Sequence, residues 1–492
     1  MKRRSSVTVF GVLNLTLALW LLGESVVFGA VVLDYRADQI LIQPKAGMSP
    51  AVLTAFHTAH GTKVAQTFPA AGGSQVITLP AGETVSGLVA KYQQSGLVEF
   101  AEPDYLVHAN ATLPNDPKFL DGTLWGLNNY GQNGGTTNAD IDAPEAWDVL
   151  TSASNIVVAV LDTGIRATHE DLASNMWVNP FNHGYGWDAF TGLNNPIDDG
   201  GHGTLVAGIL GAVGNNGKGV TGVAWRVQMM ACKCLNSSGN GNDSTVIACI
   251  NYAVGNGAKI INASFDTPTP SLAFSNAIVA ARDAGVIWVA SAGNNAYNVE
   301  VTPSYPTCYG IDNIVAVAAT TRTDDLSSYS NYGATHVALA APGDQIYTTW
   351  SPNDSYYTSL FSGTSLSAPY VSGALALLLA EYPSENYQQI IRRLLQATDP
   401  LPSLAGKCVT GGRLNLKKAL NPDIQLTPVA ASPGTFQLHL SARANRQCVL
   451  QISTDLIGWT AIYTNLTSTN GTFDFTNTIG SPRQFFRAVA AP

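Results

Sequence analysis

The chain has 492 residues, of which 46% are hydrophobic and only 12% are charged, and its formal net charge is −9. With 46 glycines and 25 prolines, this composition predicts a turn-rich globular protein with room for several domains. Because the charge is negative and basic residues do not cluster, we expect no nucleic-acid partner.

The first thirty residues predict a secretory signal peptide. Lys2-Arg3-Arg4 precede an apolar stretch from Val7 to Leu22, and small residues follow at Gly29 and Ala30. An uncleaved anchor is the alternative, but the stretch is short for a span of about 20 residues. We therefore expect an extracellular protein, released or retained at the cell surface, that meets a membrane only through this segment before cleavage.

Residues 31–110 predict a small α+β domain. Strand-like segments at 39–43, 75–79 and 98–107 enclose helix candidates at 48–60 and 84–94. The long region that follows has a different character, with continuous apolar runs that end in short polar motifs.

Asp162 and His202 stand at two of these ends. The aliphatic run 156–161 predicts a strand buried on both faces, as in a parallel sheet, and it ends at Asp162. His202 follows two glycines and begins an apolar helical pattern, so its imidazole is expected at the edge of a cleft. A turn-forming Asp and a capping His are the ordinary alternatives.

Asn294 and Ser365 complete the pattern. Asn294 follows the buried run 286–290, and Ser365 begins an apolar helix in whose first turn we expect Pro369. Capping is the alternative for Ser365. An Asn side chain and a main-chain amide at Ser365 would make a two-donor oxyanion site, and the chain order Asp, His, Ser separates one protease fold from others.

Residues 115–422 resemble the catalytic domain of subtilases, the subtilisin-like serine proteases of peptidase family S8. The matching segments include 160–165, 202–208, 292–294 and 363–369. The resemblance implies a mainly parallel, doubly wound α/β sheet with helices on both faces over residues 111–422. It also implies no cofactor for catalysis and four roles: Ser365 as nucleophile, His202 as general base, Asp162 as its orienting carboxylate, and Asn294 as oxyanion donor.

The resemblance further implies where a protein or peptide substrate adds as an extended strand. Asp266 stands where the family typically has glycine beside the substrate, which leaves selectivity open. The substrate-binding candidates are Ser264, Phe265, Gly239, Gly241 and Gly293.

A structural calcium ion is the one metal that the resemblance implies. Asp171, Asn215 and Asn216 match positions that supply oxygen ligands in many subtilases. Lys218 adds a positive charge to the same loop, and an ordinary glycine-rich turn is the alternative.

Residues 97–108 resemble the end of the inhibitor I9 propeptide that precedes many subtilases. This implies that residues 31–110 inhibit their own protease and are removed autocatalytically near residues 109–114. A permanent accessory domain is the alternative.

The pattern changes again after residue 422. Two prolines at 426–434 predict a linker. Five β-rich segments then predict a small antiparallel sandwich within residues 423–492, at 436–440, 449–453, 459–463, 472–475 and 484–489. Substrate attachment, surface attachment, stability and secretion all remain open as its role.

Six cysteines are present, and in an oxidising compartment some are expected to pair. No cysteine lies in a helix-start motif with histidine, so a thiol protease is unsupported. The sequence thus predicts a monomeric, secreted serine endopeptidase made as a zymogen. The alternative is a catalytically silent binding or surface protein with the same fold.

Overall fold

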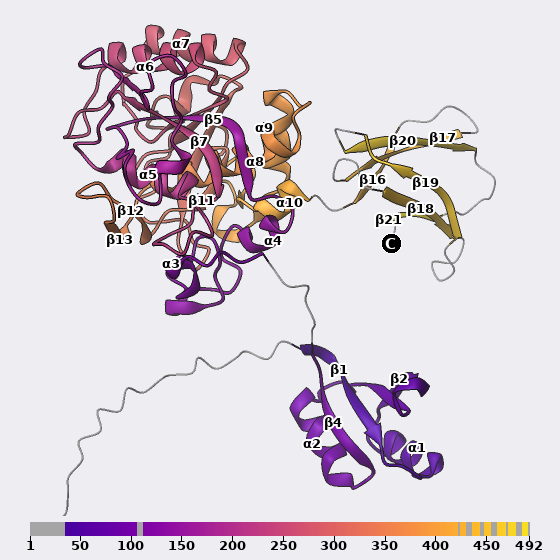
Figure 1. Cartoon of the computed structure of the whole chain (residues 1–492). Coiled ribbons are helices and arrows are strands. Elements are labelled where there is room, and N and C mark those ends of the chain that lie inside the picture. Colours follow the sequence, from indigo (N-terminus) through magenta and orange to yellow (C-terminus); the bar gives the residue numbers. More distant parts are fainter. Residues whose placement is uncertain are drawn as a thin grey trace, which may run out of the picture. The chain divides into compact units, whose positions relative to one another are not determined.

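The computed structural model describes residues 35–105, 112–421, 424–429, 435–442, 447–453, 460–468, 471–478 and 485–490. The predicted signal peptide lies outside these residues. The chain divides into two compact units, Met1–Ala109 and Asn110–Pro492 (Figure 1). In the described part of the chain, no helix is both long enough and apolar enough to cross a bilayer.

The first unit is an α+β domain. Its antiparallel sheet has the order β2-β3-β1-β4, formed by β1 (Tyr35–Pro44), β2 (Lys63–Phe68), β3 (Ser74–Thr78) and β4 (Val98–Tyr105). Helices α1 (Pro50–Ala59) and α2 (Val85–Ser95) pack on it through a core that includes Ile40, Leu53 and Leu88. Strand β2 was not predicted, because its side chains are almost all exposed and so show no alternation between buried and exposed positions.

The second unit is built on a nine-stranded, mainly parallel sheet, which confirms the predicted fold class. The strand order is β14-β15-β11-β10-β9-β8-β5-β7-β6. Only the short edge pair β14–β15 is antiparallel. The strands are β5 (Ser152–Asp162), β6 (Gly186–Asp188), β7 (Arg226–Lys233), β8 (Ile260–Ala263), β9 (Ile287–Ser291), β10 (Ile314–Thr320), β11 (Leu339–Pro342), β14 (Asp399–Pro400) and β15 (Gly412–Arg413).

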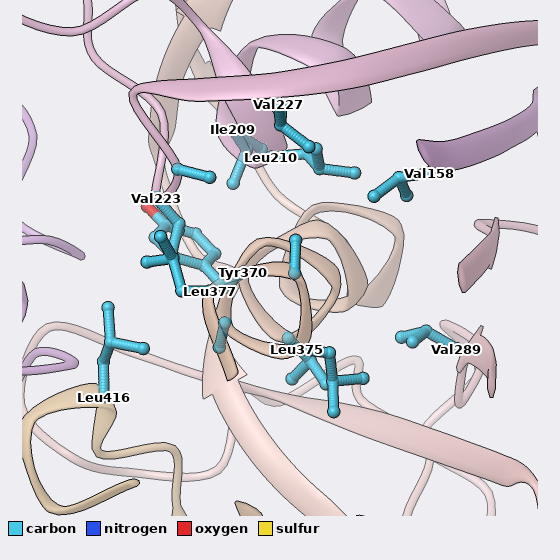
Figure 2. Packing of buried hydrophobic residues seen from close by; sticks show 14 of the residues in the cluster. Val158, Ile209, Leu210, Val223, Val227, Val289, Tyr370, Leu375, Leu377 and Leu416 are labelled. Atoms are coloured by element: carbon cyan, nitrogen blue, oxygen red, sulfur yellow. The ribbon is translucent and has the colours of Figure 1, made fainter. Parts of the chain in front are cut away.

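Helices cover both faces of this sheet. On one face, α5 (His202–Gly211) and α8 (Thr364–Glu381) share a core with Val158 and Val289 (Figure 2). On the other face, α6 (Asp243–Gly255) and α7 (Leu272–Asp283) pack against Leu161 and Trp288. The remaining helices of this unit are α3 (Pro117–Leu120), α4 (Ala143–Trp147), α9 (Tyr387–Gln396) and α10 (Leu416–Leu420).

Helix α8 is the central element of the core. All but four of its eighteen residues are buried, which explains why its sequence is apolar on every side. A small antiparallel hairpin, β12 (Ile346–Thr349) and β13 (Tyr357–Phe361), precedes it.

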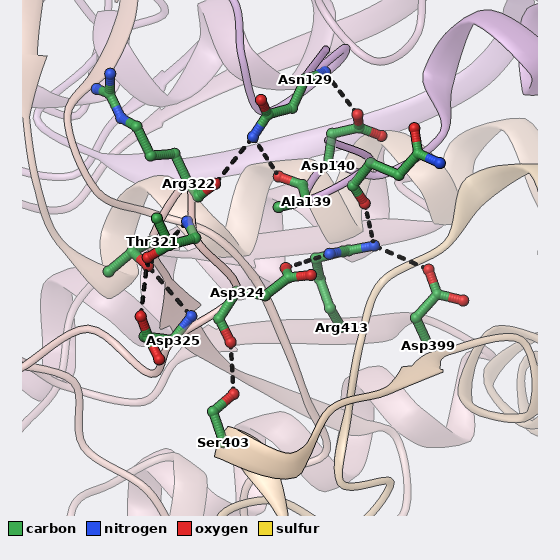
Figure 3. Close-up of polar contacts among 12 residues, drawn as sticks. Asn129, Ala139, Asp140, Thr321, Arg322, Asp324, Asp325, Asp399, Ser403 and Arg413 are labelled. Atoms are coloured by element: carbon green, nitrogen blue, oxygen red, sulfur yellow. Dashed lines mark hydrogen bonds and ion pairs between the residues drawn. The ribbon is translucent and has the colours of Figure 1, made fainter. Parts of the chain in front are cut away.

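Arg413, in the edge region of the sheet, binds three segments that are distant in sequence. Its side chain is only 3% exposed, and it forms ion pairs with Asp324 and Asp399 while donating to the carbonyl of Asn138 at 2.9 Å (Figure 3). A buried guanidinium needs such partners, since leaving one unpaired is costly. Residues far apart in sequence are thereby joined at the edge of this sheet.

The C-terminal residues form two three-stranded antiparallel sheets, β16-β17-β20 and β19-β18-β21. Tyr463 of one sheet packs against Phe473 and Phe475 of the other. The predicted linker at 426–434 was wrong in part, because β16 (Gln425–Val429) covers residues 426–429. Pro428 is tolerated because β16 is an edge strand. The strands are β16 (Gln425–Val429), β17 (Thr435–Ser441), β18 (Gln447–Ser453), β19 (Thr460–Leu466), β20 (Thr472–Thr478) and β21 (Phe485–Ala490).

Candidate active site

Three neighbouring strands end in the residues that build the site. Strands β9, β8 and β5 are adjacent and parallel, and Leu161 pairs with Ala263, which pairs in turn with Ala290. Asp162, Ser264 and Asn294 lie at or just beyond these ends. Since neighbouring strands are about 4.8 Å apart, segments separated by 100 residues meet at one edge of the sheet.

Asp162 and His202 form a direct pair. The Asp162 side chain is fully buried, and both its carboxylate oxygens lie 2.9 Å from His202 Nδ1. The His202 side chain is 35% exposed. Because Nδ1 faces the carboxylate, the imidazole is held with Nε2 available to accept a proton.

Desolvation lowers the pKa of His202, but other interactions outweigh it. The charge of Asp162, its hydrogen bond and the charge of Asp198 raise the pKa of His202 above the ordinary 6.5. The pair therefore stabilises a positive charge on the ring, which is the charge that a general base acquires.

Asp198 is a site residue that the sequence analysis missed. Its buried carboxylate accepts the main-chain N–H groups of Gly200, Gly201 and Thr204, at 3.1, 2.6 and 2.9 Å. It thus caps helix α5 and shapes the turn that presents His202. The hydroxyl of Thr163 also donates to it at 2.7 Å, which links the turn to the residue after Asp162. The sequence signal that could have identified Asp198 is an acidic residue two positions before Gly200-Gly201, at the start of the predicted helix.

Ser365 lies in the first turn of α8, but the expected position of Pro369 was wrong. The helix begins at Thr364, so Pro369 lies inside it rather than in the first turn. Proline has no N–H, and the carbonyl of Ser365, four residues earlier, therefore lacks its helical donor. The Ser264 hydroxyl donates to that carbonyl at 2.8 Å. This hydrogen bond connects the start of α8 to the end of β8, and it is possible because Pro369 leaves the carbonyl of Ser365 free.

The hydroxyl of Ser365 donates to the main-chain carbonyl of Ser264 at 3.1 Å. Among the described residues it makes no hydrogen bond to His202. A rotation about one side-chain bond redirects this hydroxyl, and catalytic hydrogen bonds commonly tighten only when substrate binds.

Asn294 is oriented by Thr364. Its Oδ1 accepts both the main-chain N–H and the hydroxyl of Thr364, each at 2.9 Å. This arrangement leaves the Nδ2 group as the free donor. A β-carbon placed on Gly363 would lie 3.5 Å from Asn294 Nδ2 and 3.8 Å from the Ser365 nitrogen, so both donors border one small space that glycine leaves open. Two convergent N–H donors suit a developing oxyanion.

The predicted substrate-binding residues occupy two loops at the same edge. Ser264 and Gly293 belong to the cluster just described, while Phe265 stacks on Phe274 in the core. Gly239 and Gly241 lie in the loop between β7 and α6. That loop reaches the histidine turn, since a β-carbon on Gly200 would lie 3.1 Å from the carbonyl of Ser237.

The residues predicted for calcium do not fit a cation in this arrangement. The Asp171 oxygens accept hydrogen bonds from Asn216 Nδ2, the N–H of Val220 and the hydroxyl of Tyr357, at 2.8, 2.9 and 2.9 Å. The Asn215 and Asn216 side-chain oxygens accept main-chain N–H groups. Burial and the charges of Asp171 and Glu170 raise the pKa of Tyr357, so its hydroxyl stays a donor. Within the described residues, no cluster of acids, histidines or cysteines has metal-binding geometry.

We therefore expect chelation to leave the thermal stability of the protein unchanged. A site saturated a hundredfold above its Kd would contribute about 2.7 kcal/mol, and EDTA would remove that contribution. The measurement is Tm by calorimetry with EDTA and with added calcium, using Ser365→Ala protein to prevent self-digestion. A calcium-dependent rise in Tm that Asp171→Asn abolishes would contradict the expectation.

Five cysteines of the described part of the chain are free thiols, where the sequence predicted that some cysteines pair. Cys232, Cys234, Cys249, Cys308 and Cys408 form no disulfide in the structure. The first three are buried between β7 and α6, where the Cys249 thiol is hydrogen-bonded to those of Cys232 and Cys234.

Comparisons with known proteins agree with this geometry. The subtilase family model matches residues 153–422. The chain is 36% identical to thermitase of Thermoactinomyces vulgaris over 62% of its length and 99% of that protein. It is 38% identical to subtilisin DY of Bacillus licheniformis over 49% of its length and 82% of that protein. A solved protease structure from Pseudoalteromonas arctica superposes with a TM-score of 0.53 at 30% identity, covering 63% of this chain and 98% of that one.

The amino-terminal domain matches a different family model from the one expected. Residues 25–104 match the fervidolysin N-terminal prodomain, which corrects the assignment to inhibitor I9 while keeping a prodomain at this position. More than half of the chain matches the subtilase model, and the matched region contains the whole Asp, His, Asn and Ser cluster. The chain therefore belongs to the subtilase family and is a subtilisin-family serine protease preceded by a prodomain.

Proposed function

We propose that the protein is a secreted endopeptidase that hydrolyses peptide bonds through an acyl-enzyme on Ser365. The observation that carries the proposal is the meeting of four distant segments at the ends of β5, β8 and β9. There a buried carboxylate orients an imidazole, and two N–H donors border the start of the serine helix.

In this mechanism His202 takes the proton of the Ser365 hydroxyl as the oxygen attacks the substrate carbonyl carbon. The negative charge that forms on the carbonyl oxygen is stabilised by Asn294 Nδ2 and the Ser365 N–H. His202 then gives the proton to the leaving amine, which departs and leaves an ester on Ser365. Water, activated by the same imidazole, hydrolyses the ester. Asp162 stabilises the protonated ring throughout.

We propose four parts for the chain: a signal peptide at 1–30, a prodomain at 31–110, the catalytic domain at 111–422 and a β module at 423–492. The prodomain would inhibit the protease until the enzyme cleaves it near residues 109–114. A parallel sheet with many long-range contacts folds slowly, and this gives a folding template a physical purpose.

A fluorophosphonate probe tests the proposal directly. It reacts only with an activated serine, so wild-type protein should be labelled, with the adduct mapped by mass spectrometry to the peptide that contains Ser365. A silent binding protein with the same fold would show no such labelling.

Asn294, the proposed oxyanion donor, is the subject of a separate prediction. Asn294→Ala should lower kcat by about 10² to 10³, the loss measured for this donor in subtilisin, with little change in KM. The donor acts on charge that exists only in the transition state. Steady-state kinetics on a peptide substrate measures both constants, and Asn295→Ala, an exposed neighbouring amide, is the control. A raised KM at unchanged kcat would instead make Asn294 a ground-state binding residue.

A further inference from the structure

Asp266 places a carboxylate against Gly293, the residue that precedes the candidate oxyanion donor Asn294. It lies two residues beyond Ser264, whose carbonyl accepts the Ser365 hydroxyl at 3.1 Å. Its Oδ2 is also 3.1 Å from the position that a β-carbon on Gly293 would occupy, and Gly293 directly precedes Asn294. The carboxylate therefore borders both the segment that contacts the nucleophile and the segment that carries the oxyanion donor.

The position of this carboxylate is well determined. The hydroxyl of Ser304, a residue only 4% exposed, donates to Asp266 Oδ2 at 2.7 Å. The residues that follow, Thr267 and Tyr305, exchange two main-chain hydrogen bonds of 2.8 and 2.9 Å. The segment that contains Asp266 is thus joined to the segment that contains Ser304 by both side-chain and main-chain hydrogen bonds. The carboxylate is therefore held in place before any substrate binds.

The charge of Asp266 has no counter-ion in the described part of the chain. Asp266 is exposed, and none of the ion pairs there includes it. A single hydroxyl donor leaves most of the lone pairs of a carboxylate free. The site therefore has both the charge and the acceptor capacity to receive a cation.

We propose that Asp266 selects lysine or arginine as the residue immediately before the scissile bond, an inference that rests on the proposed function. The side chain of that residue branches from the carbon next to the carbonyl under attack. With the carbonyl oxygen on Asn294 and its carbon at Ser365, we place this side chain beside Gly293 and the Ser264–Asp266 segment, since Ser264 contacts Ser365 and Asp266 lies against Gly293. An arginine can bind a carboxylate through two parallel hydrogen bonds, and lysine through its point charge.

The same geometry disfavours substrates with a neutral side chain at this position. The unpaired charge of Asp266 opposes the negative charge that forms on the substrate carbonyl oxygen in the transition state. A substrate cation neutralises this carboxylate as it binds. The selectivity should therefore include a penalty on neutral substrates as well as a gain for basic ones.

The experiment compares peptides that differ only by arginine or its neutral isostere citrulline before the scissile bond. In the mature wild-type enzyme, kcat/KM should favour arginine by about tenfold. In Asp266→Asn, which keeps a side-chain oxygen for Ser304, the ratio should fall to about one, and turnover of the citrulline peptide should rise. Asp283→Asn removes an exposed carboxylate at the end of α7 and should leave the ratio unchanged. High salt should lower the wild-type ratio.

An unchanged arginine-to-citrulline ratio in an active Asp266→Asn enzyme would overturn the inference and leave the proposed function intact. The inference would also be overturned if selectivity for basic residues appeared at a different substrate position. If the wild type cleaves no peptide in a broad library, the proposed function itself fails, and the inference fails with it.

Discussion

Ser365→Ala is expected to lower kcat by about 10⁶, the scale observed when the nucleophile of subtilisin is removed. The substitution deletes the atom that forms the acyl-enzyme but keeps the main-chain N–H that we assign to the oxyanion site. The Ser365 hydroxyl makes one hydrogen bond, to the Ser264 carbonyl, so folding should be affected by only about 1 kcal/mol. Peptide hydrolysis and fluorophosphonate labelling measure the loss.

The same variant tests autoprocessing. Expressed in a host without other proteases, Ser365→Ala should keep residues 31–110, while the wild type should lose them, as amino-terminal sequencing would show. Ser355→Ala, an exposed serine in the β12–β13 loop, is the matched control and should process normally. If the Ser365→Ala protein still loses its prodomain in that host, autocatalytic removal must be abandoned.

Asp162→Asn is expected to lower kcat by about 10⁴. The amide keeps the size of the side chain, but it cannot stabilise a protonated imidazole, and it favours the wrong tautomer of His202. The variant should remain folded because the shape of the buried site is conserved. Residual activity should come from the two N–H donors.

The pH dependence of the residual activity carries a second signature. His202 must be neutral to act as a base, so activity falls as the pH drops through its pKa. Since Asp162 raises the pKa of His202, the acidic limb of kcat/KM in the wild type should lie above 6.5, and Asp162→Asn should move it to lower pH. Asp121→Asn, which removes a surface carboxylate paired with Lys118, should leave the limb in place. An acidic limb that stays fixed in Asp162→Asn would contradict the assigned role.

Local pattern was enough to place the main catalytic candidates on their elements. Asp162 ends an aliphatic strand, His202 begins α5, and Ser365 lies in the first turn of α8, as the apolar runs and glycines predicted. These features were readable because each depends on residues within one helix or strand, where side-chain periodicity reports burial directly.

The features that were not predicted correctly depend on residues elsewhere in the chain. Strand β2 is exposed and has no pattern, and β16 exists as an edge strand paired with β17 despite its proline. Pro369 is accommodated inside α8 because Ser264, about a hundred residues earlier, supplies a donor to the freed carbonyl. No window of sequence contains both partners of that contact.

Short motifs and periodic burial were sufficient to identify the family, the chain order of the catalytic candidates and the elements that carry them. Three contacts could be seen only in the folded chain: Asp198 caps the histidine turn, Tyr357 and Asn216 donate to the Asp171 oxygens predicted to bind calcium, and Asp266 lies against Gly293, next to the candidate oxyanion donor. Each of these depends on which loops meet at the edge of the sheet. That meeting is set by the packing of the whole core, and hydrogen bonds of about 3 Å between distant loops leave no periodic trace in the chain.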